Sequence, residues 1–111
     1  MEDKTITIRE MYEFQEKLQA KYQVQWGEPL SPAMSRNKLL WAYGEMGEAG
    51  DILKKKGPKK IMEEPEVRRA FLEEMGDVLM YMWDVLICLG LSPEEFSEAY
   101  REKCERNINR W

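Results

Sequence analysis

Residues 71–91 read FLEEMGDVLMYMWDVLICLGL, and this stretch decides the fold. Its second half, Val78 to Leu91, is apolar around nearly the whole circumference of a helix, so it requires cover on several sides. It holds only 14 residues, with Asp84 among them, and is too short to span a bilayer. We predict a core helix that lies near a subunit interface, because a small four-helix monomer struggles to cover it; the alternative is that the other helices suffice.

Helix start and stop signals divide the rest of the chain into four helices. Thr7 with Glu10 forms a capping box before a first apolar stripe, and a loop with two prolines follows at 26–34. Further helices are expected from Ser35, as the N-cap, to about 56, and at about 65–89. A last helix is expected from Ser92, which forms a second capping box with Glu95. No alternating strand pattern competes. The sequence therefore predicts one all-α domain over residues 1–111, a four-helix bundle that assembles as a homodimer or homotetramer.

Composition narrows the chemistry. The 111 residues include no histidine, which excludes His-based nucleophile pairs, general bases and metal ligands. A net charge of −4 argues against a nucleic acid polymer as partner. Cys88 lies in an apolar run, Cys104 lies in a charged segment, and the N-terminal residues carry no apolar signal segment. These features favour a reduced, cytoplasmic setting without membrane association, in which polar chemistry rests on the 21 acidic residues.

Two carboxylate pairs stand out among those acids. Glu45 and Glu48 are three residues apart on one helical face, and Glu74 and Asp77 repeat the arrangement on the next long helix. Apolar residues bracket both pairs on their own rows. If the rows face each other, the four carboxylates converge, which requires a bound cation or the protonation of some carboxylates. All-oxygen ligands favour Mg²⁺, with Mn²⁺ as a substitute and Ca²⁺ as an alternative.

Glycines accompany both motifs. Gly44, Gly47 and Gly50 lie in the first helix and Gly76 in the second, and each helical glycine costs about 0.5–1 kcal/mol relative to alanine. We expect the close approach of another helix to explain them. Either acidic motif alone is typical of a solvated helix face, but two of them with apolar brackets and glycines favour a metal site.

The spacing of the acids resembles the MazG-like all-α nucleotide pyrophosphohydrolases, particularly their compact dCTP-pyrophosphatase-like branch. The motif reads Glu45-x-x-Glu48, then 25 residues, then Glu74-x-x-Asp77. The ending Lys103-x-x-Arg106-Asn107-x-x-Arg110-Trp111 is similar to that family's C-terminal motif, and the resemblance covers residues 26–111.

The resemblance implies a homo-oligomeric enzyme that hydrolyses nucleoside triphosphates to a monophosphate and pyrophosphate. It implies that Glu45, Glu48, Glu74 and Asp77 hold Mg²⁺, and Glu45 and Glu48 are the candidates for the general base. The resemblance further implies a set of substrate-binding residues: Tyr81, Lys103, Arg106, Asn107 and Arg110, with Trp26 and Asn37 as candidates for the base or sugar pocket.

One departure limits what the resemblance implies. The compact branch often carries a base-stacking aromatic residue seven positions after the second glutamate, where this chain has Lys55. Base preference therefore does not carry over. Two alternatives stay open: a phosphoribosyl-ATP pyrophosphohydrolase of the same superfamily, and a helical module that binds metal, nucleotide or a partner protein without catalysis. Trp41 and Trp83 are interpreted as core and interface residues.

Overall fold

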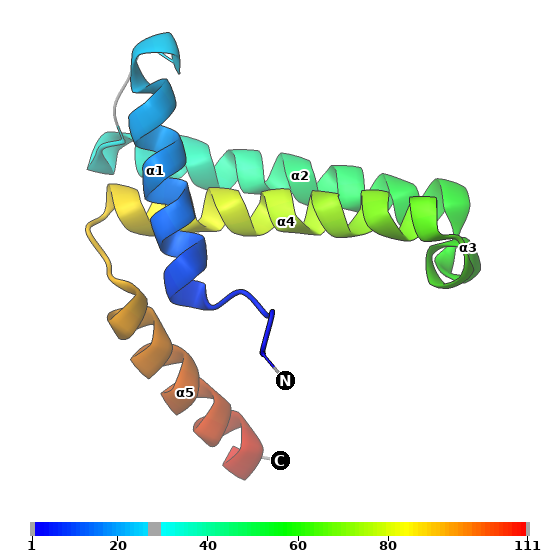
Figure 1. Cartoon of the computed structure of the whole chain (residues 1–111). Helices are drawn as coiled ribbons and strands as arrows, with labels where there is room; N and C mark the ends of the chain where they lie inside the picture. The colour runs from blue at the N-terminus through cyan, green and yellow to red at the C-terminus, as the bar shows by residue number, and fades with distance from the viewer. Residues whose placement is uncertain (1, 27–29, 111) are drawn as a thin grey trace.

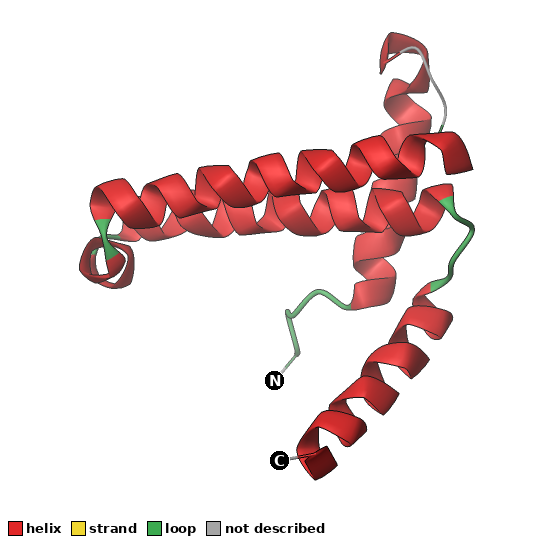
Figure 2. Ribbon diagram, turned by 180° about the vertical axis from the view of Figure 1, so that it is seen from behind, coloured by secondary structure: helices red, strands yellow, loops and turns green. Residues whose placement is uncertain are grey.

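The computed structural model describes residues 2–26 and 30–110, and these residues contain helices and loops but no strand (Figures 1 and 2). The prediction of an all-α protein is therefore confirmed. The helices are α1 (Ile8–Trp26), the short 3-10 helix η1 (Pro32–Met34), α2 (Ser35–Lys56), α3 (Pro58–Glu63), α4 (Pro65–Cys88) and α5 (Pro93–Arg110).

Capping boxes begin the first and last helices, as the sequence predicts. The backbone N–H of Glu10 donates to Thr7 Oγ1 at 3.1 Å, and the Thr7 N–H donates back to Glu10 Oε1 at 3.0 Å. Ser92 and Glu95 repeat this exchange at the start of α5, at 3.1 and 3.0 Å. Each box satisfies two backbone donors that a helix start would otherwise leave unpaired.

The start of α2 differs from the prediction. Ser35 is the first residue inside the helix and not its N-cap, because the 3-10 turn of η1 leads directly into α2. The Ser35 hydroxyl donates to the carbonyl of Pro32 at 2.7 Å. The helix α3 was also not predicted, since Gly57-Pro58 reads as a simple stop. Gly57 adopts φ 84° and turns the chain sharply between α2 and α3.

The helices α2 and α4 lie side by side and antiparallel, with α3 at the far end of the arm they form (Figure 1). Ala42 and Ala49 of α2 and Val78 of α4 are buried. Small side chains on α2 let the two helices approach closely, so the residues on either side of their seam come together.

The other two helices meet this arm at one end. Helix α1 crosses the arm, and Trp83 of α4 is buried between Tyr12 of α1 and Phe96 of α5, with ring centroids 6.3 and 5.2 Å away. Trp83 and Cys88 are thus core residues, as predicted. Beyond Phe96, α5 runs away from the arm (Figure 1). Among the described residues α5 packs against α1 and makes no backbone approach to α2. The bundle of four helices therefore stays a prediction.

No single described helix has both the length and the apolar character needed to cross a bilayer. Only α4 and α5 taken together meet those two criteria, and the chain bends by 114° between them.

The chain is more extended than a compact domain of its size. Its radius of gyration is 16.4 Å, whereas a compact domain of this length has about 13 Å. Its accessible surface is 8896 Å², against roughly 6,400 Å² for a compact monomer of this mass. A large part of the surface that a folded domain normally hides is therefore open.

The expectation that a helix approaches the glycines is wrong within a single chain. A Cβ atom placed on Gly44, Gly47, Gly50 or Gly76 would meet no atom within 4 Å. The three glycines of α2 face outward, where no described part of the chain covers them.

Candidate metal centre

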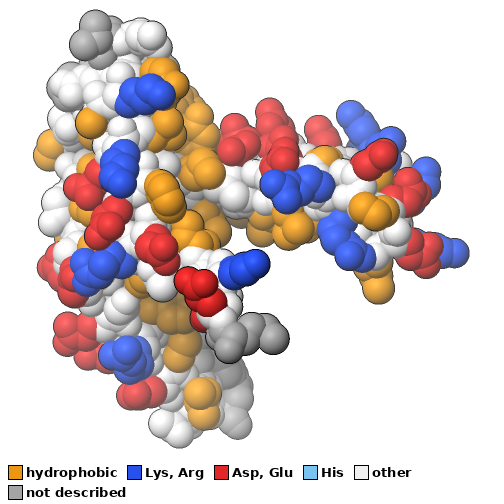
Figure 3. All heavy atoms as spheres, in the orientation of Figure 1, with side chains coloured by type: hydrophobic (Ala, Val, Ile, Leu, Met, Phe, Trp, Pro, Cys, Tyr) orange, Lys and Arg blue, Asp and Glu red, His pale blue; other side chains and the backbone are white. Residues whose placement is uncertain are grey.

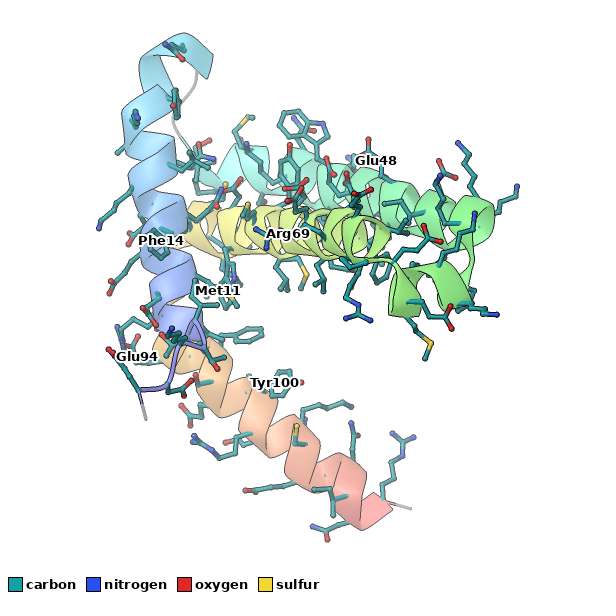
Figure 4. All side chains as sticks on the ribbon, turned by 45° about the vertical axis from the view of Figure 1, so that its right-hand side comes forward. Met11, Phe14, Glu48, Arg69, Glu94 and Tyr100 are labelled. Atoms are coloured by element: carbon teal, nitrogen blue, oxygen red, sulfur yellow. The ribbon has the colours of Figure 1, made fainter. Side chains whose placement is uncertain are left out.

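Three carboxylates from the two long helices converge midway along the arm. Glu45 and Glu48 of α2 and Glu74 of α4 each offer an oxygen atom, and these oxygens lie within 4.8 Å of one another. Glu45 and Glu74 are half-buried and Glu48 is exposed, as its position on the arm in Figure 4 illustrates. The acidic rows of α2 and α4 therefore face each other at these three residues.

Asp77, the fourth predicted ligand, lies beside this group but outside it. Its charge raises the pKa of both Glu45 and Glu74, and it lines the same cavity as Glu45. The predicted set of four is therefore a cluster of three with a fourth carboxylate next to it.

The antiparallel register explains why the acids meet. Lys38 of α2 faces Asp84 of α4, and Trp41 faces Tyr81. In the same alignment, Glu45 faces Asp77 and Glu48 faces Glu74. Contacts confirm the first two pairs: Lys38 Nζ lies 3.7 Å from Asp84 Oδ2, and the Trp41 and Tyr81 rings are 5.9 Å apart. Steps of three or four residues keep each row on one helix face.

Burial and close contact between the carboxylates raise the pKa values of two of them. Hydrogen bonding to Glu48, together with burial, raises the pKa of Glu74 from 4.5 to about 7. Burial is also the main cause that raises the pKa of Glu45, and the neighbouring charges of Glu48 and Asp77 add to it. Without a cation, Glu74 therefore titrates near neutral pH and carries a proton in about half of the molecules at pH 7.

Two oxygen atoms of the cluster are left without a hydrogen-bond partner. Among the described residues, Glu45 Oε2 and Glu74 Oε2 are buried and unpaired. A buried carboxylate oxygen without a partner is costly, and either a bound cation or a proton shared between the carboxylates would offset that cost. The donor set consists of carboxylate oxygens only, which suits Mg²⁺ or Mn²⁺.

A cavity of about 830 Å³ opens next to the cluster, where α1, α2 and α4 meet. Its size is in the range of sites that hold small organic ligands. Its lining is mixed, with acidic, amide, cationic, aromatic and aliphatic side chains: Gln15, Leu18, Gln19, Leu30, Met34, Lys38, Trp41, Glu45, Asp77, Met80, Tyr81 and Asp84.

Tyr81 and Trp41 form one wall of the cavity. Their rings meet edge to face at an interplanar angle of 74°, and burial is the main cause that raises the pKa of Tyr81. Tyr81 thus lies beside the carboxylates, where the sequence predicts it. Trp41 is not a core residue of the single chain, because 48% of its surface is exposed and it lines the cavity; its place at a subunit interface stays a prediction.

The predictions missed a polar network at the α1 end of the cavity. Asp84 is 1% exposed and accepts hydrogen bonds from Gln15 Nε2 at 2.8 Å and Gln19 Nε2 at 3.2 Å, with Lys38 beside it. Burial raises the pKa of Asp84, and its hydrogen bonds and Lys38 oppose that rise. An aspartate inside a long apolar run was the available signal, because a buried charge needs partners.

The predicted substrate-binding residues of α5 are not brought to the cluster. Lys103, Arg106 and Arg110 are exposed and Asn107 is half-buried on the part of α5 that runs away from the arm (Figure 1). Arg106 and Arg110 line a shallow depression on α5 itself.

The remaining two candidates are Asn37 and Trp26. Asn37 is exposed on α2 and is not part of the cavity wall. Trp26 is the last residue of α1, and its side chain lies outside the described residues. Lys55 is exposed near the end of α2, away from the cavity lining.

Comparisons of the chain with protein-family models, curated proteins and solved structures gave no match.

Proposed function

We propose that this protein is a Mg²⁺-dependent hydrolase that converts nucleoside triphosphates to a nucleoside monophosphate and pyrophosphate. One observation carries the proposal: a cluster of three carboxylates with two unpartnered buried oxygens lies beside a cavity of about 830 Å³, and one of the three, Glu45, lines that cavity. A cation site beside a cavity with aromatic and amide walls suits a ligand with phosphates at one end and a planar ring at the other.

Glu45, Glu48 and Glu74 hold the ion in this proposal, and Asp77 completes the set from the next turn of α4. Bound there, Mg²⁺ neutralises phosphate charge and lowers the pKa of a coordinated water. Because the pKa of Glu74 is about 7 in the empty cluster, that residue gives up its proton as the ion binds.

The reaction balances on one water molecule. The water oxygen forms a bond to the α-phosphorus, the bond to the bridging oxygen of the β-phosphate breaks, and pyrophosphate leaves. Glu45 or Glu48 accepts the proton of the attacking water or orients it. Glu48 is the better placed of the two to exchange that proton with solvent, because it is exposed.

Self-association is part of the proposal. Apolar stripes at helical spacing stay open along the arm on both long helices, with Leu39, Met46 and Leu53 on α2 and Leu72, Met75, Leu79 and Met82 on α4, each 42–58% exposed. On the part of the arm next to α1, Figure 3 shows hydrophobic side chains at the lower edge and acidic ones at the upper edge, whereas charged side chains occupy both edges toward the far end. Two such arms packed together make a four-helix bundle.

A second copy of the chain would also explain why α5 points away from the arm. The basic residues of α5 do not approach the carboxylate cluster of their own chain. We infer that Lys103, Arg106 and Arg110 contact the triphosphate bound to a neighbouring subunit. The homodimer or homotetramer is thus proposed as the catalytic unit.

Pyrophosphate release tests the proposed activity. Purified protein with Mg²⁺ is given standard and modified nucleoside triphosphates, and we expect release with at least one of them. Glu48→Gln should lower the rate about 100-fold or more, because it removes a charged ligand and a proton acceptor. Asp51→Asn, one turn further along α2 and exposed, is the matched control and should keep the rate.

The same panel separates the alternatives. Release from phosphoribosyl-ATP alone would favour that related activity. No release from any substrate, together with a melting temperature that rises with Mg²⁺, would favour a binding module without catalysis. A melting temperature that millimolar Mg²⁺ leaves unchanged would contradict the metal site itself.

A further inference from the structure

At the α1 end of the cavity lies a network of polar side chains that has no role in the proposed hydrolysis. Asp84 sits at its centre and is almost fully buried. The two amide nitrogens that it accepts from belong to Gln15 and Gln19, so the carbonyl oxygen of each carboxamide lies at the opposite end of its group. Those oxygens can only accept hydrogen bonds.

Lys38 adds a donor at the same place. Its side chain is 10% exposed, and Nζ lies 3.7 Å from Asp84 Oδ2, which is longer than a hydrogen bond. The ammonium also lies 4.8 Å from the centre of the Trp41 ring and 5.8 Å from that of Tyr81. Lys38 is thus a nearly desolvated cation that retains N–H donors and lines the cavity.

The position of this network along the arm fits a nucleotide. Lys38 and Asp84 are each seven residues from Glu45 and Asp77 on the same helix face, which is about 10 Å along the helix axes. The aromatic pair of Trp41 and Tyr81 lies between the two ends. The carboxylate cluster, the aromatic pair and the polar network follow one another along the arm, so a nucleotide with its phosphates at the cluster would bring its base to the network.

We propose that Lys38, fixed by Asp84, together with Gln15 and Gln19, determines which base the site accepts. Lys38 Nζ donates to an acceptor on the ring edge, and a glutamine carbonyl oxygen accepts from a neighbouring ring N–H or amino group. The proposal rests on the nucleotide function above and deepens it by naming the specificity-determining residues. These residues position the base and take no part in the chemical step.

The competing explanation is that the network only ties α1 to the arm. Gln15 and Gln19 come from α1, Lys38 from α2 and Asp84 from α4, so it joins three helices. A tie of this kind changes stability but does not distinguish one base from another. The two explanations therefore differ in a readout other than stability.

Nucleoside binding, measured without hydrolysis, provides that readout. The four 2′-deoxynucleosides, with 2-deoxyribose as the ringless reference, are titrated into isotope-labelled full-length protein, and the indole N–H signal of Trp41 is followed by NMR. Wild-type protein should discriminate among the four bases and show no binding of deoxyribose. Mg²⁺ with inorganic tripolyphosphate, titrated separately, reports the carboxylate end.

Lys38→Met should weaken the preferred nucleoside about tenfold, as expected for the loss of one charged hydrogen bond. The differences among the four dissociation constants should shrink, while tripolyphosphate binding stays within twofold. Lys54→Met, at the exposed end of the same helix, is the control and should behave as wild type. If Lys38→Met does not fold, Lys38→Arg keeps the charge but moves the donors, and it should reorder the preferences.

Two results would overturn the inference. One is that the nucleosides leave the Trp41 signal unchanged in wild-type protein. The other is that the Lys38 variants keep the wild-type order and spread of dissociation constants, which would leave the network a tie between helices only. Absence of pyrophosphate release would instead overturn the hydrolase proposal, because nucleoside binding requires neither metal nor turnover.

Discussion

Glu74 shows how a single residue couples this site to pH. Hydrogen bonding to Glu48 and burial place its pKa at about 7 in the folded chain, against 4.5 ordinarily. Between these pH values the folded chain binds more protons than the unfolded chain, so the free energy of unfolding falls as pH rises. The electrostatic cost of a charged Glu74 in the folded chain is absent below pH 4.5 and fully present above about pH 7.

This linkage predicts the effect of Glu74→Gln in protein without metal. The melting temperature of the wild type should fall between pH 4.5 and 8, and the variant should show a smaller fall because glutamine does not titrate. Some dependence should remain, since the pKa of Glu45 is raised as well. Thermal unfolding monitored by circular dichroism over this pH range is the measurement.

Glu73→Gln is the matched control for that experiment. Glu73 is one position away, exposed, and paired with Arg69 on the outer side of α4 at 3.1 Å. Its replacement should leave the pH dependence as in the wild type. Identical slopes for Glu74→Gln and the wild type would contradict the protonated cluster.

At the scale of elements, local signals were sufficient where interactions are local. The capping boxes at Thr7 and Ser92 and the acidic rows of α2 and α4 could be predicted, because the partners are three or four residues apart. The network around Asp84 could not, since Gln15 lies 69 residues away and only the crossing of α1 brings it there. The divergence of α5 likewise depends on tertiary contacts that periodicity does not encode.

The junction of α2 and α3 offers a prediction on backbone conformation. Gly57 combines φ 84° with ψ 159°, a region that residues with a Cβ avoid. Gly57→Ala should therefore lower the free energy of unfolding by about 1–3 kcal/mol. Its neighbour Lys56→Ala, in ordinary helical conformation and exposed, should change it little. Urea denaturation of both variants at one protein concentration makes the comparison; equal effects would contradict the conformational explanation.

At the scale of the whole molecule, the open surface supports the proposed homodimer or homotetramer. The accessible area of one chain exceeds that of a compact monomer by roughly 2,500 Å². For two chains this makes roughly 5,000 Å², at the upper end of the total area that obligate homodimers bury. The outward glycines of α2 point the same way, because their cost in helix stability is offset if another helix packs closely there. The apolar stripes of the arm supply the matching contact.

Leu79→Glu tests this assembly. Leu79 is 42% exposed on the open stripe of α4, so a charge there should shift the protein from dimer or tetramer toward monomer. Met62→Glu, on α3 and 67% exposed, lies off the stripe and should leave the assembly intact. Sedimentation velocity over a range of concentrations distinguishes these outcomes, and a monomeric wild type would contradict the interface.

The antiparallel register of α2 and α4 has a consequence for how the chain can change in length. Every facing pair along the arm, from Lys38 with Asp84 to Glu48 with Glu74, depends on the same antiparallel alignment of the two helices. One inserted residue between Trp41 and Glu45 would rotate the carboxylates about 100° away from those of α4. The same insertion beyond Lys56 would leave every pair in place. Length variation among descendants of this chain should therefore be confined to the α3 end of the arm, and the segment between Lys38 and Glu48 should be inherited without gaps.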